Sequence, residues 1–367
     1  MPFTVLTDSH VKDIFRKLST SQLLVFVQSL EKALIEYSCR DGSQYQPHRG
    51  VVTRPWGQVS LFMSATTESL IGVKIVGIRP SNAAMSGTSQ KPEPALKSAL
   101  TLCDAQGRAT GVLNAADLTA FRTALGSMLL FRLRRSVANV VVFGAGKQAP
   151  WHIELAMLLR GQDIRKITIV NRSSTRTDAL LGELLNSSEF KPPSHVRITA
   201  FGGGANRDTS LEELVVDADA IFCTTPATEP LFPSRFLTSP QAQGKARFIS
   251  AIGSYRLDMQ EIDPGLLRSI TNPSTSPSFP LYNGGVVAVD SVQGCMEEAG
   301  VTPDKMLEIG TILQERSSSG SAELNPWLEY GFVIYKSVGV GIMDLAIGQD
   351  LIRIAGSQNV GWVLDDF

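Results

Sequence analysis

The fold is decided by residues 136–176, which read SVANVVVFGAGKQAPWHIELAMLLRGQDIRKITIVNRSSTR. A β-branched apolar run over residues 140–143 stops at a glycine, and apolar side chains then recur at helical spacing over residues 153–159. A second β-branched run follows at residues 167–170. A Gly-x-Gly-x-x-Ala turn separates the first run from the helix, and this order predicts the strand–turn–helix–strand unit that binds a dinucleotide at its first turn.

Each small residue of that turn has a physical role. Gly144 allows the chain to turn tightly, Gly146 lets the backbone approach a pyrophosphate, and Ala149 lets the helix lie close to the strand. The helix N-terminus adds free N–H groups and the positive end of the helix dipole. We therefore expect the turn to bind the cofactor, together with Lys147 and Gln148 between its glycines and its alanine.

The segment after the second run indicates which dinucleotide binds. Units that bind NAD usually carry an acidic residue there, whereas a 2′-phosphate requires cations and hydroxyls. Residues 171–176 contain no carboxylate and two arginines, whose forked N–H groups match a phosphate. We predict NADPH in preference to NADH; the alternative is a solvated polar loop that accepts either cofactor. The residues assigned to this contact are Asn171, Arg172, Ser173 and Arg176.

Composition excludes several classes of function. The chain has 367 residues, of which 43% are hydrophobic and 19% charged, with a formal net charge of −1. This is the composition of a globular protein with room for two domains, and it gives no general affinity for nucleic acid or anionic membranes. No apolar run reaches the ~20 residues that span a bilayer. Four histidines and four dispersed cysteines, without a C-x-x-C pair, predict no metal site and reduced, mostly buried thiols in a cytoplasmic protein.

The first third of the chain has a different pattern. Residues 19–37 have helical spacing, whereas short apolar runs between residues 51 and 78 alternate with Gly, Pro and Asn, as in antiparallel strands. Residues 100–113 predict a hairpin, and residues 118–133 predict a helix that leads into the first Rossmann strand. Further parallel strands are expected at residues 196–200, 220–223, 248–251 and 286–289.

These patterns predict an α/β chain of two domains. Residues 123–332 form a Rossmann-type domain with a doubly wound parallel sheet. Residues 1–122 form a second, α+β domain, completed by a C-terminal helix within residues 333–367. We predict that the last helix runs from 332 to 355 and packs closely, on the first domain, through Gly339, Gly341 and Gly348.

Seven segments of the chain form a specific pattern when taken together, in this order around a Rossmann fingerprint, although each alone is a weak signal. They are QPHRGVV (46–52), GVKIVGIRPSN (72–82), CDAQG (103–107), TAFRTALGS (119–127), GAGKQA (144–149), GSYRLDMQEID (253–263) and YKSVGVGIMD (335–344). In these segments, and over nearly its whole length, the chain resembles the ornithine cyclodeaminase/μ-crystallin family.

The resemblance implies a homodimer with NAD(P)-linked redox chemistry at the α-carbon of an amino or imino acid. It assigns substrate binding and dimerisation to the first domain, and it makes Arg49, Lys74 and Arg122 the catalytic residues that hold the substrate carboxylate. Without the resemblance, Arg122 would be interpreted as a helix-surface cation and Lys74 as an ordinary strand-end cation. Met63 and Tyr255 are expected to contact the substrate. Further cofactor contacts are expected from Thr88, Thr224, Thr225, Gly253 and Ser337.

Burial beside two arginines should lower the pKa of Lys74, so that it can exchange a proton with the substrate nitrogen or a water. Two departures from the family pattern bear on the reaction. Cyclodeaminases carry carboxylates at the positions of Leu61 and Tyr255, and both are missing here. We interpret Asp258 and Glu261 as surface or helix-start charges.

We therefore predict an NADPH-dependent oxidoreductase of amino-acid metabolism that reduces imino acids, cyclic ketimines such as piperideine- or pyrroline-2-carboxylate, by hydride transfer to the C=N carbon. The alternatives are an NAD(P)-linked amino-acid dehydrogenase of the alanine dehydrogenase type, an ornithine cyclodeaminase, and a crystallin-type protein that binds NADPH and a small ligand. Three cations favour the enzyme, because an apolar ligand does not require them.

Overall fold

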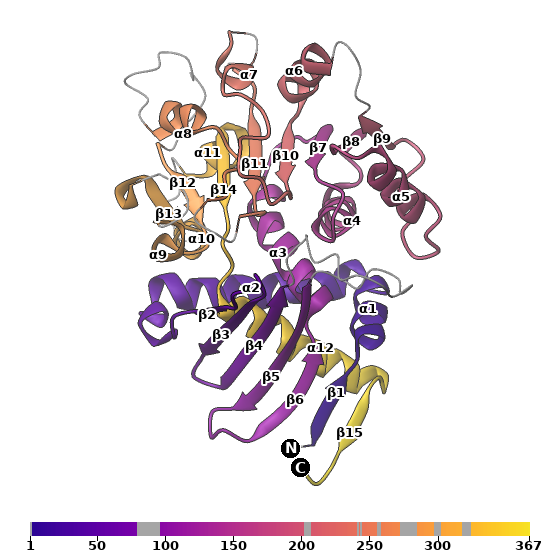
Figure 1. Cartoon of the computed structure of the whole chain (residues 1–367), viewed down its shortest axis with the longest axis vertical. Coiled ribbons are helices and arrows are strands. Elements are labelled where there is room, and N and C mark those ends of the chain that lie inside the picture. The colour runs from indigo at the N-terminus through magenta and orange to yellow at the C-terminus, as the bar shows by residue number, and fades with distance from the viewer. Residues whose placement is uncertain are drawn as a thin grey trace. The chain divides into compact units, whose positions relative to one another are not determined.

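The computed structural model describes residues 2–78, 96–201, 207–240, 242, 244–254, 258–271, 285–296, 302–317 and 324–367, with the backbone alone for residues 207–210. The chain divides into two units, which Figure 1 shows. Unit 1 holds Met1–Arg122 and Val340–Phe367, and unit 2 holds Thr123–Gly339. Each unit is built around its own sheet.

Unit 2 contains the parallel sheet that residues 136–176 predict. All of its neighbouring strands are parallel. Among the described residues the eight strands are, in spatial order, β13 (Met306–Glu308), β12 (Val287–Val289), β14 (Phe332–Lys336), β11 (Arg247–Ala251), β10 (Ala220–Cys223), β7 (Asn139–Phe143), β8 (Lys166–Val170) and β9 (Arg197–Phe201).

The strand order of unit 2 indicates at which edge of the sheet a ligand would bind. From β7 the chain moves outward through β8 to β9 and then returns to β10 on the other side of β7. The order therefore reverses between β7 and β10, and in such sheets ligands bind outside the carboxyl ends of the strands at this point. Those ends lead into Gly144 and Thr224.

Helices cover both faces of this sheet. Successive residues of a strand point to opposite faces, so neighbouring residues of β10 show which helices lie on each side. Ile221 of β10 packs in one apolar core with Val215 of α6 (Arg207–Asp217). The next residue, Phe222, has its ring 5.3 Å from that of Phe131 in α3 (Ala116–Phe131) and 5.1 Å from that of His152 in α4 (Gln148–Arg160). The predicted doubly wound sheet is confirmed. The other helices are α5 (Ser174–Leu185), α7 (Arg235–Thr238), α8 (Pro264–Thr271), α9 (Val292–Met296), α10 (Ile309–Ser317) and α11 (Leu324–Tyr330).

Unit 1 has a mixed sheet of seven strands among its described residues. Only β1 and β6 pair in parallel; the remaining neighbours are antiparallel. In spatial order the strands are β15 (Trp362–Leu364), β1 (Phe3–Leu6), β6 (Ala109–Asn114), β5 (Leu96–Asp104), β4 (Leu70–Ile78), β3 (Val59–Thr66) and β2 (Gly50–Thr53). The predicted antiparallel strands and the hairpin of β5 and β6 are confirmed.

The described residues of unit 1 also form α1 (Asp8–Arg16), α2 (Thr20–Cys39), α12 (Gly341–Gln358) and the start of α3. The predicted helix at residues 19–37 corresponds to α2, which starts with a capping box between Ser19 and Gln22. In Figure 1, α12 runs along the sheet, where it packs on β3, β4 and β5. The helix lies so close to the sheet that a Cβ on Gly348 would come within 2.6 Å of Leu100 Cδ2.

The predicted last helix is wrong at its start. Residues 332–336 form β14, in which every residue is buried, and α12 begins only at Gly341. An apolar run of five residues that is buried on both faces has no period, so it can continue a helical pattern by chance. The chain accordingly returns to unit 1 after Gly339, where φ is +80°. The predicted boundary, between residues 332 and 333, lies seven residues earlier.

A buried polar network ties α3, α4 and β11 together. Ser127 Oγ lies 3.0 Å from His152 Nε2 and 2.7 Å from Ser250 Oγ, and His152 Nδ1 lies 2.8 Å from the carbonyl oxygen of Gln148. All three side chains of the network are 0% exposed, so the network lies inside unit 2. Burial lowers the pKa of His152 to about 4, against a weaker opposing effect of its hydrogen bond to Gln148.

His152 should therefore make the protein sensitive to acid. Its depressed pKa contributes stability above about 6.5 that is lost as the pH falls toward 4, because the unfolded chain then binds the proton more strongly. Between pH 7 and pH 4, the free energy of unfolding should fall by about 3 kcal/mol more in the wild type than in a His152→Gln variant. Urea unfolding at both pH values measures this difference, and an equal fall in both proteins would contradict it.

Candidate functional site

The glycine turn of unit 2 is shaped by its neighbours. Gly144 has φ +117°, and a Cβ there would lie 2.6 Å from Thr224 Oγ1 and 2.8 Å from Thr225 Oγ1. A Cβ on Gly146, by contrast, would meet nothing within 4 Å. The turn is therefore packed against the end of β10 at Gly144 and open at Gly146, where a ligand can approach the backbone.

The start of α4 lies at this turn. Lys147, at the N-cap, provides no side-chain hydrogen bond to the first turn. The backbone N–H of Ala149 donates to the carbonyl oxygen of Gly146 at 3.1 Å, and Pro150 has no N–H, so neither residue offers a free N–H group. Oε1 of Gln148 is buried and has no hydrogen-bond partner in the described structure. Ala149 is 0% exposed. The open turn at the start of a helix fits a dinucleotide pyrophosphate, because the positive end of the helix dipole lies there.

The segment at the end of β8 carries the two arginines. Asn171 Nδ2 donates to the carbonyl oxygen of Ser173 at 3.1 Å, and Ser173 Oγ caps α5 by accepting from the backbone N–H of Arg176 at 3.4 Å. The guanidinium groups of Arg172 and Arg176 are exposed beside this cap. The backbone is thus fixed while the cations remain accessible to a phosphate.

Three other residues assigned to the cofactor lie at the carboxyl ends of β10, β11 and β14. Thr224 Oγ1 donates to the carbonyl oxygen of Phe143 at 2.8 Å, and Ser337 Oγ donates to Asp290 Oδ2 at 2.6 Å. Gly253 has no room for a Cβ, which would collide with the carbonyl oxygen of Thr225. Thr88 lies outside the described residues.

The site predicted in unit 1 is centred on a buried ion pair. Lys74, on β4, has its Nζ 2.8 Å from Oδ1 and 2.7 Å from Oδ2 of Asp344, on α12. Both residues are 0% exposed. Arg122, 5% exposed, donates from Nε to the same Oδ1 at 3.2 Å. One carboxylate therefore binds two buried cations.

The cations act on one another as the sequence analysis expects. Burial lowers the pKa of Lys74 to about 8; the charge of Asp344 opposes this, whereas the charges of Arg122 and Arg49 lower the pKa further. Arg49 is half-buried, between η1 (Gly42–Tyr45) and β2. The structure thus brings Arg49, Lys74 and Arg122 into one electrostatic cluster, in which the two arginines lower the pKa of the lysine.

The wall beside the cluster is apolar. Met63 is the register partner of Lys74 across β3 and β4, and it is 7% exposed. Leu61 belongs to the same buried group as Met63 and Val76. Position 61 therefore contributes no carboxylate to this wall. Tyr255 lies outside the described residues.

Sequence reasoning missed Asp344 and misjudged Glu261. The signal for Asp344 is a single carboxylate in the apolar segment GIMDLAIG, since a charge in such a segment is buried only with a partner. Glu261 was interpreted as a surface or helix-start charge, and this is wrong: it is 2% exposed and bonded to the backbone after β11. Asp258, in the same segment, is exposed as predicted.

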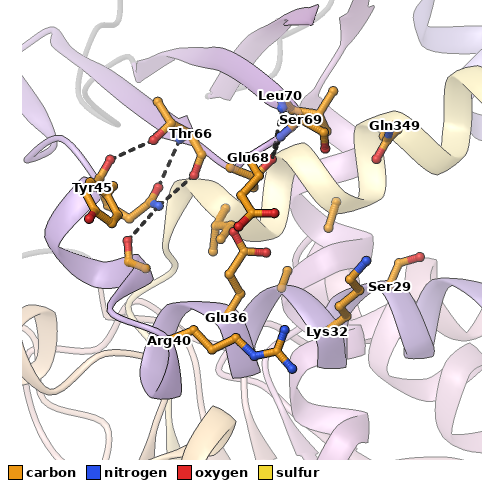
Figure 2. A pocket seen from close by; sticks show the side chains of 16 residues that line it. Ser29, Lys32, Glu36, Arg40, Tyr45, Thr66, Glu68, Ser69, Leu70 and Gln349 are labelled. Carbon is orange, nitrogen blue, oxygen red and sulfur yellow. Dashed lines mark hydrogen bonds between the residues drawn. The ribbon is translucent and has the colours of Figure 1, made fainter. Parts of the chain in front are cut away.

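Figure 2 shows a separate hollow of unit 1, about 750 Å³ in volume, between α2, η1, the β3–β4 turn and α12. Gln46 Nε2 links its walls by donating to one carbonyl oxygen of η1 and to one at the end of β3, at 3.0 and 2.8 Å. Glu36 and Glu68 point toward one another across it, and Glu68 is exposed. Lys74 is not among the lining residues, so this hollow is distinct from the cluster.

Searches for two other kinds of feature find none in the part of the chain that the structure describes. No group of three or more His, Cys, Asp or Glu side chains is placed to hold a metal ion. No described helix is long and apolar enough to cross a membrane. Of the four cysteines, Cys223 and Cys295 are buried, Cys103 is half-buried and Cys39 is exposed.

The ion pair predicts a large effect of one substitution. Asp344→Asn leaves the charges of Lys74 and Arg122 buried without a carboxylate, so the free energy of unfolding at pH 7 should fall by about 3–5 kcal/mol. Asp13→Asn, at an exposed position of α1, is the control and should change it by less than about 0.5 kcal/mol. Equal values for the two variants in urea unfolding would show that the pair contributes nothing.

Known proteins resemble the whole chain. No protein-family model matches it. An uncharacterized cyclodeaminase of Dictyostelium discoideum is 27% identical over 317 residues, 82% of this chain and 79% of the relative. A Δ(1)-pyrroline-2-carboxylate reductase of Bacillus cereus is 25% identical, covering 82% and 83% of the two chains. The ketimine reductase mu-crystallin of Mus musculus is 26% identical, covering 93% of each.

Solved structures share the fold. An archaeal alanine dehydrogenase dimer with bound NAD has a TM-score of 0.73 at 17% identity, with each chain covered completely. The Δ(1)-pyrroline-2-carboxylate reductase of Thermococcus litoralis, in complex with NADH and L-proline, has a TM-score of 0.72 at 17% identity, covering 98% of this chain and 99% of the other. With these relatives and this fold, the resemblance to the ornithine cyclodeaminase/μ-crystallin family found in the sequence is confirmed.

Proposed function

We propose that this protein is an NADPH-dependent reductase of imino acids, cyclic ketimines such as pyrroline- or piperideine-2-carboxylate. The observation that carries the proposal is the cluster in unit 1, where the carboxylate of Asp344 binds Lys74 and Arg122 and the charge of Arg49 also acts on Lys74. A second carboxylate, that of the substrate, complements the remaining charge.

The coarser class is an NAD(P)H-dependent oxidoreductase acting on CH–NH or C=N groups. Two of the relatives are named as reductases of Δ(1)-pyrroline-2-carboxylate and of ketimines, and structural neighbours hold NAD or NADH. The glycine turn at the start of α4 supports the same class from this chain's own residues.

The residues divide the work. When bound, the cofactor supplies the hydride for the C=N carbon. Arg122 and Arg49 bind and orient the substrate carboxylate, and Met63 closes the wall beside it. Lys74, with a pKa of about 8, holds a proton at Nζ that it exchanges with the substrate nitrogen, while Asp344 keeps its ammonium group in place. Tyr255 remains a proposed substrate contact.

Reduction is favoured over cyclodeamination by the wall at Leu61. A cyclodeaminase binds a second amino group and releases ammonia, and a buried, apolar Leu61 in contact with Met63 and Val76 offers that group no partner. The proposed reaction ends with the amino acid and oxidised cofactor.

A homodimer is part of the proposal. One face of the sheet of unit 1 exposes large apolar side chains on β2, β3 and β4, among them Val52, Phe62, Ile71 and Ile75, which are 39–45% exposed. Phe62 and Ile75 are register partners, so they form one continuous patch. Such a patch on a folded protein indicates a protein–protein interface, and a second copy of this chain fits it by symmetry.

The reaction has a direct test. With pyrroline-2-carboxylate or piperideine-2-carboxylate, the wild type should oxidise one NADPH for each amino acid formed, because the hydride is not returned to the cofactor. With ornithine or lysine it should release no ammonia. Proline made from ornithine, with catalytic cofactor and one ammonia per turnover, would overturn the assignment.

Cofactor preference has its own test. Arg172→Ala should weaken NADPH binding by about 1.5–3 kcal/mol, the value of a charged hydrogen bond, and leave NADH binding nearly unchanged. Titration of both cofactors by fluorescence measures this, with Arg197→Ala, at the exposed start of β9, as the control. Equal losses for NADPH and NADH would show that Arg172 does not bind the 2′-phosphate.

A further inference from the structure

Glu261 has an unusual environment for a carboxylate. Its Oε2 accepts from the backbone N–H of Gly253 at 2.8 Å, from the backbone N–H of Ser254 at 3.2 Å and from Ser254 Oγ at 3.2 Å. Glu261 and Ser254 are each 2% exposed. Three donors thus converge on one oxygen atom, at the point where the chain leaves β11.

Charged and titratable groups face this carboxylate from two neighbouring strands. Lys336, the last residue of β14, has its Nζ 4.0 Å from Oε2, and Cys223 is the last residue of β10. Burial raises the pKa of Glu261 to about 7, against the opposing effects of Lys336 and of the three hydrogen bonds. Burial and the charge of Glu261 raise the pKa of the Cys223 thiol, which is therefore neutral.

Close packing connects Glu261 to the glycine turn. A Cβ on Gly253 would collide with the carbonyl oxygen of Thr225 and lie 2.6 Å from Glu261 Oε1. Thr225 in turn presents its hydroxyl to Gly144, at 2.8 Å from the position of a Cβ there. A continuous series of contacts therefore runs from Glu261 through Gly253 and Thr225 to Gly144.

The position of this series in the sheet indicates which half of a dinucleotide it serves. A Rossmann sheet has two halves, each binding one mononucleotide, and they meet at the order reversal between β7 and β10. The half with β8 carries Arg172 and Arg176 and so takes the 2′-phosphorylated nucleoside. The half with β10, β11 and β14 is left for the nicotinamide nucleoside, and Gly253 and Ser254 lie at its edge.

We infer that Glu261, paired with Lys336, is a positioning residue for the nicotinamide half of the cofactor: it holds Gly253 and Ser254 against Thr225 and thereby fixes the edge of that subsite. The inference rests on the proposed use of NADPH, but it is independent of which substrate is reduced. It assigns Glu261 no contact with the reacting atoms.

The test compares two ligands and two variants. Glu261→Gln keeps the size of the side chain but removes its charge, so the hydrogen bonds to Gly253 and Ser254 weaken. Its dissociation constant for NADPH at pH 8 should rise about fivefold, whereas that for 2′-phospho-ADP-ribose, which lacks the nicotinamide, should stay unchanged. NADH should lose as much as NADPH, which separates this effect from that of Arg172. Asp258→Asn, an exposed acid of the same segment, is the matched control and should change neither ligand.

The pH dependence gives a second readout. In the wild type the ratio of the two dissociation constants should change as Glu261 titrates near pH 7, with NADPH binding relatively weaker at pH 6 than at pH 8. In Glu261→Gln this ratio should be constant. If Glu261→Gln fails to fold, Ser254→Ala removes one donor without altering a charge and should weaken NADPH selectively, though by less.

Equal weakening of both ligands, or a wild-type ratio independent of pH, would overturn the inference. A wild type that binds 2′-phospho-ADP-ribose and NADPH but reduces no imine would contradict the proposed reaction alone. A wild type that binds neither ligand would contradict the proposed cofactor, and with it the role of Glu261.

Discussion

The site of unit 1 depends on the buried contact between Lys74 and Asp344. Removing an ammonium and a carboxylate from water costs several kcal/mol each, and their attraction offsets this only when the geometry is close and further donors are present. Here Nζ lies within 2.8 Å of both carboxylate oxygens, and Arg122 donates to one of them. Helix α12 must therefore be seated firmly on the sheet, and Gly341 and Gly348 allow that approach. A rigid anchor for two cations is what an anionic substrate requires.

In unit 2 a buried carboxylate again holds a proposed binding site, but there the requirement is close approach of a ligand to the backbone. A dinucleotide must approach the backbone closely, so the ends of β7, β10 and β11 are packed against one another through Gly144 and Gly253, neither of which has space for a Cβ. Thr224, between them, holds the end of β7, because its Oγ1 donates to the carbonyl oxygen of Phe143. The carboxylate of Glu261 then fixes the last of these segments from behind. In both units a buried acid holds the groups that are proposed to bind a ligand.

Local patterns were sufficient to predict most of the fold and part of the site. The strand–turn–helix–strand unit, α2 and the β5–β6 hairpin follow from spacing alone, because their signals lie within a few residues of one another. β14 was taken for the start of a helix because a doubly buried strand has no period. Asp344 was missed because its partner lies 270 positions away in the chain, and Glu261 because its burial depends on the packing of three strands. Partner identity across such distances is set by tertiary structure, which a single sequence does not display.

The central claim is that the cations of unit 1 recognise a carboxylate, and the most direct measurement varies that group alone. kcat/KM should be determined for pyrroline-2-carboxylate and for its carboxamide, in the wild type and in Arg122→Ala. The wild type should prefer the carboxylate by about 100-fold, and the preference should shrink by about tenfold or more in the variant, because a charged hydrogen bond is worth about 1.5–3 kcal/mol. A preference that is the same in both proteins would contradict the account.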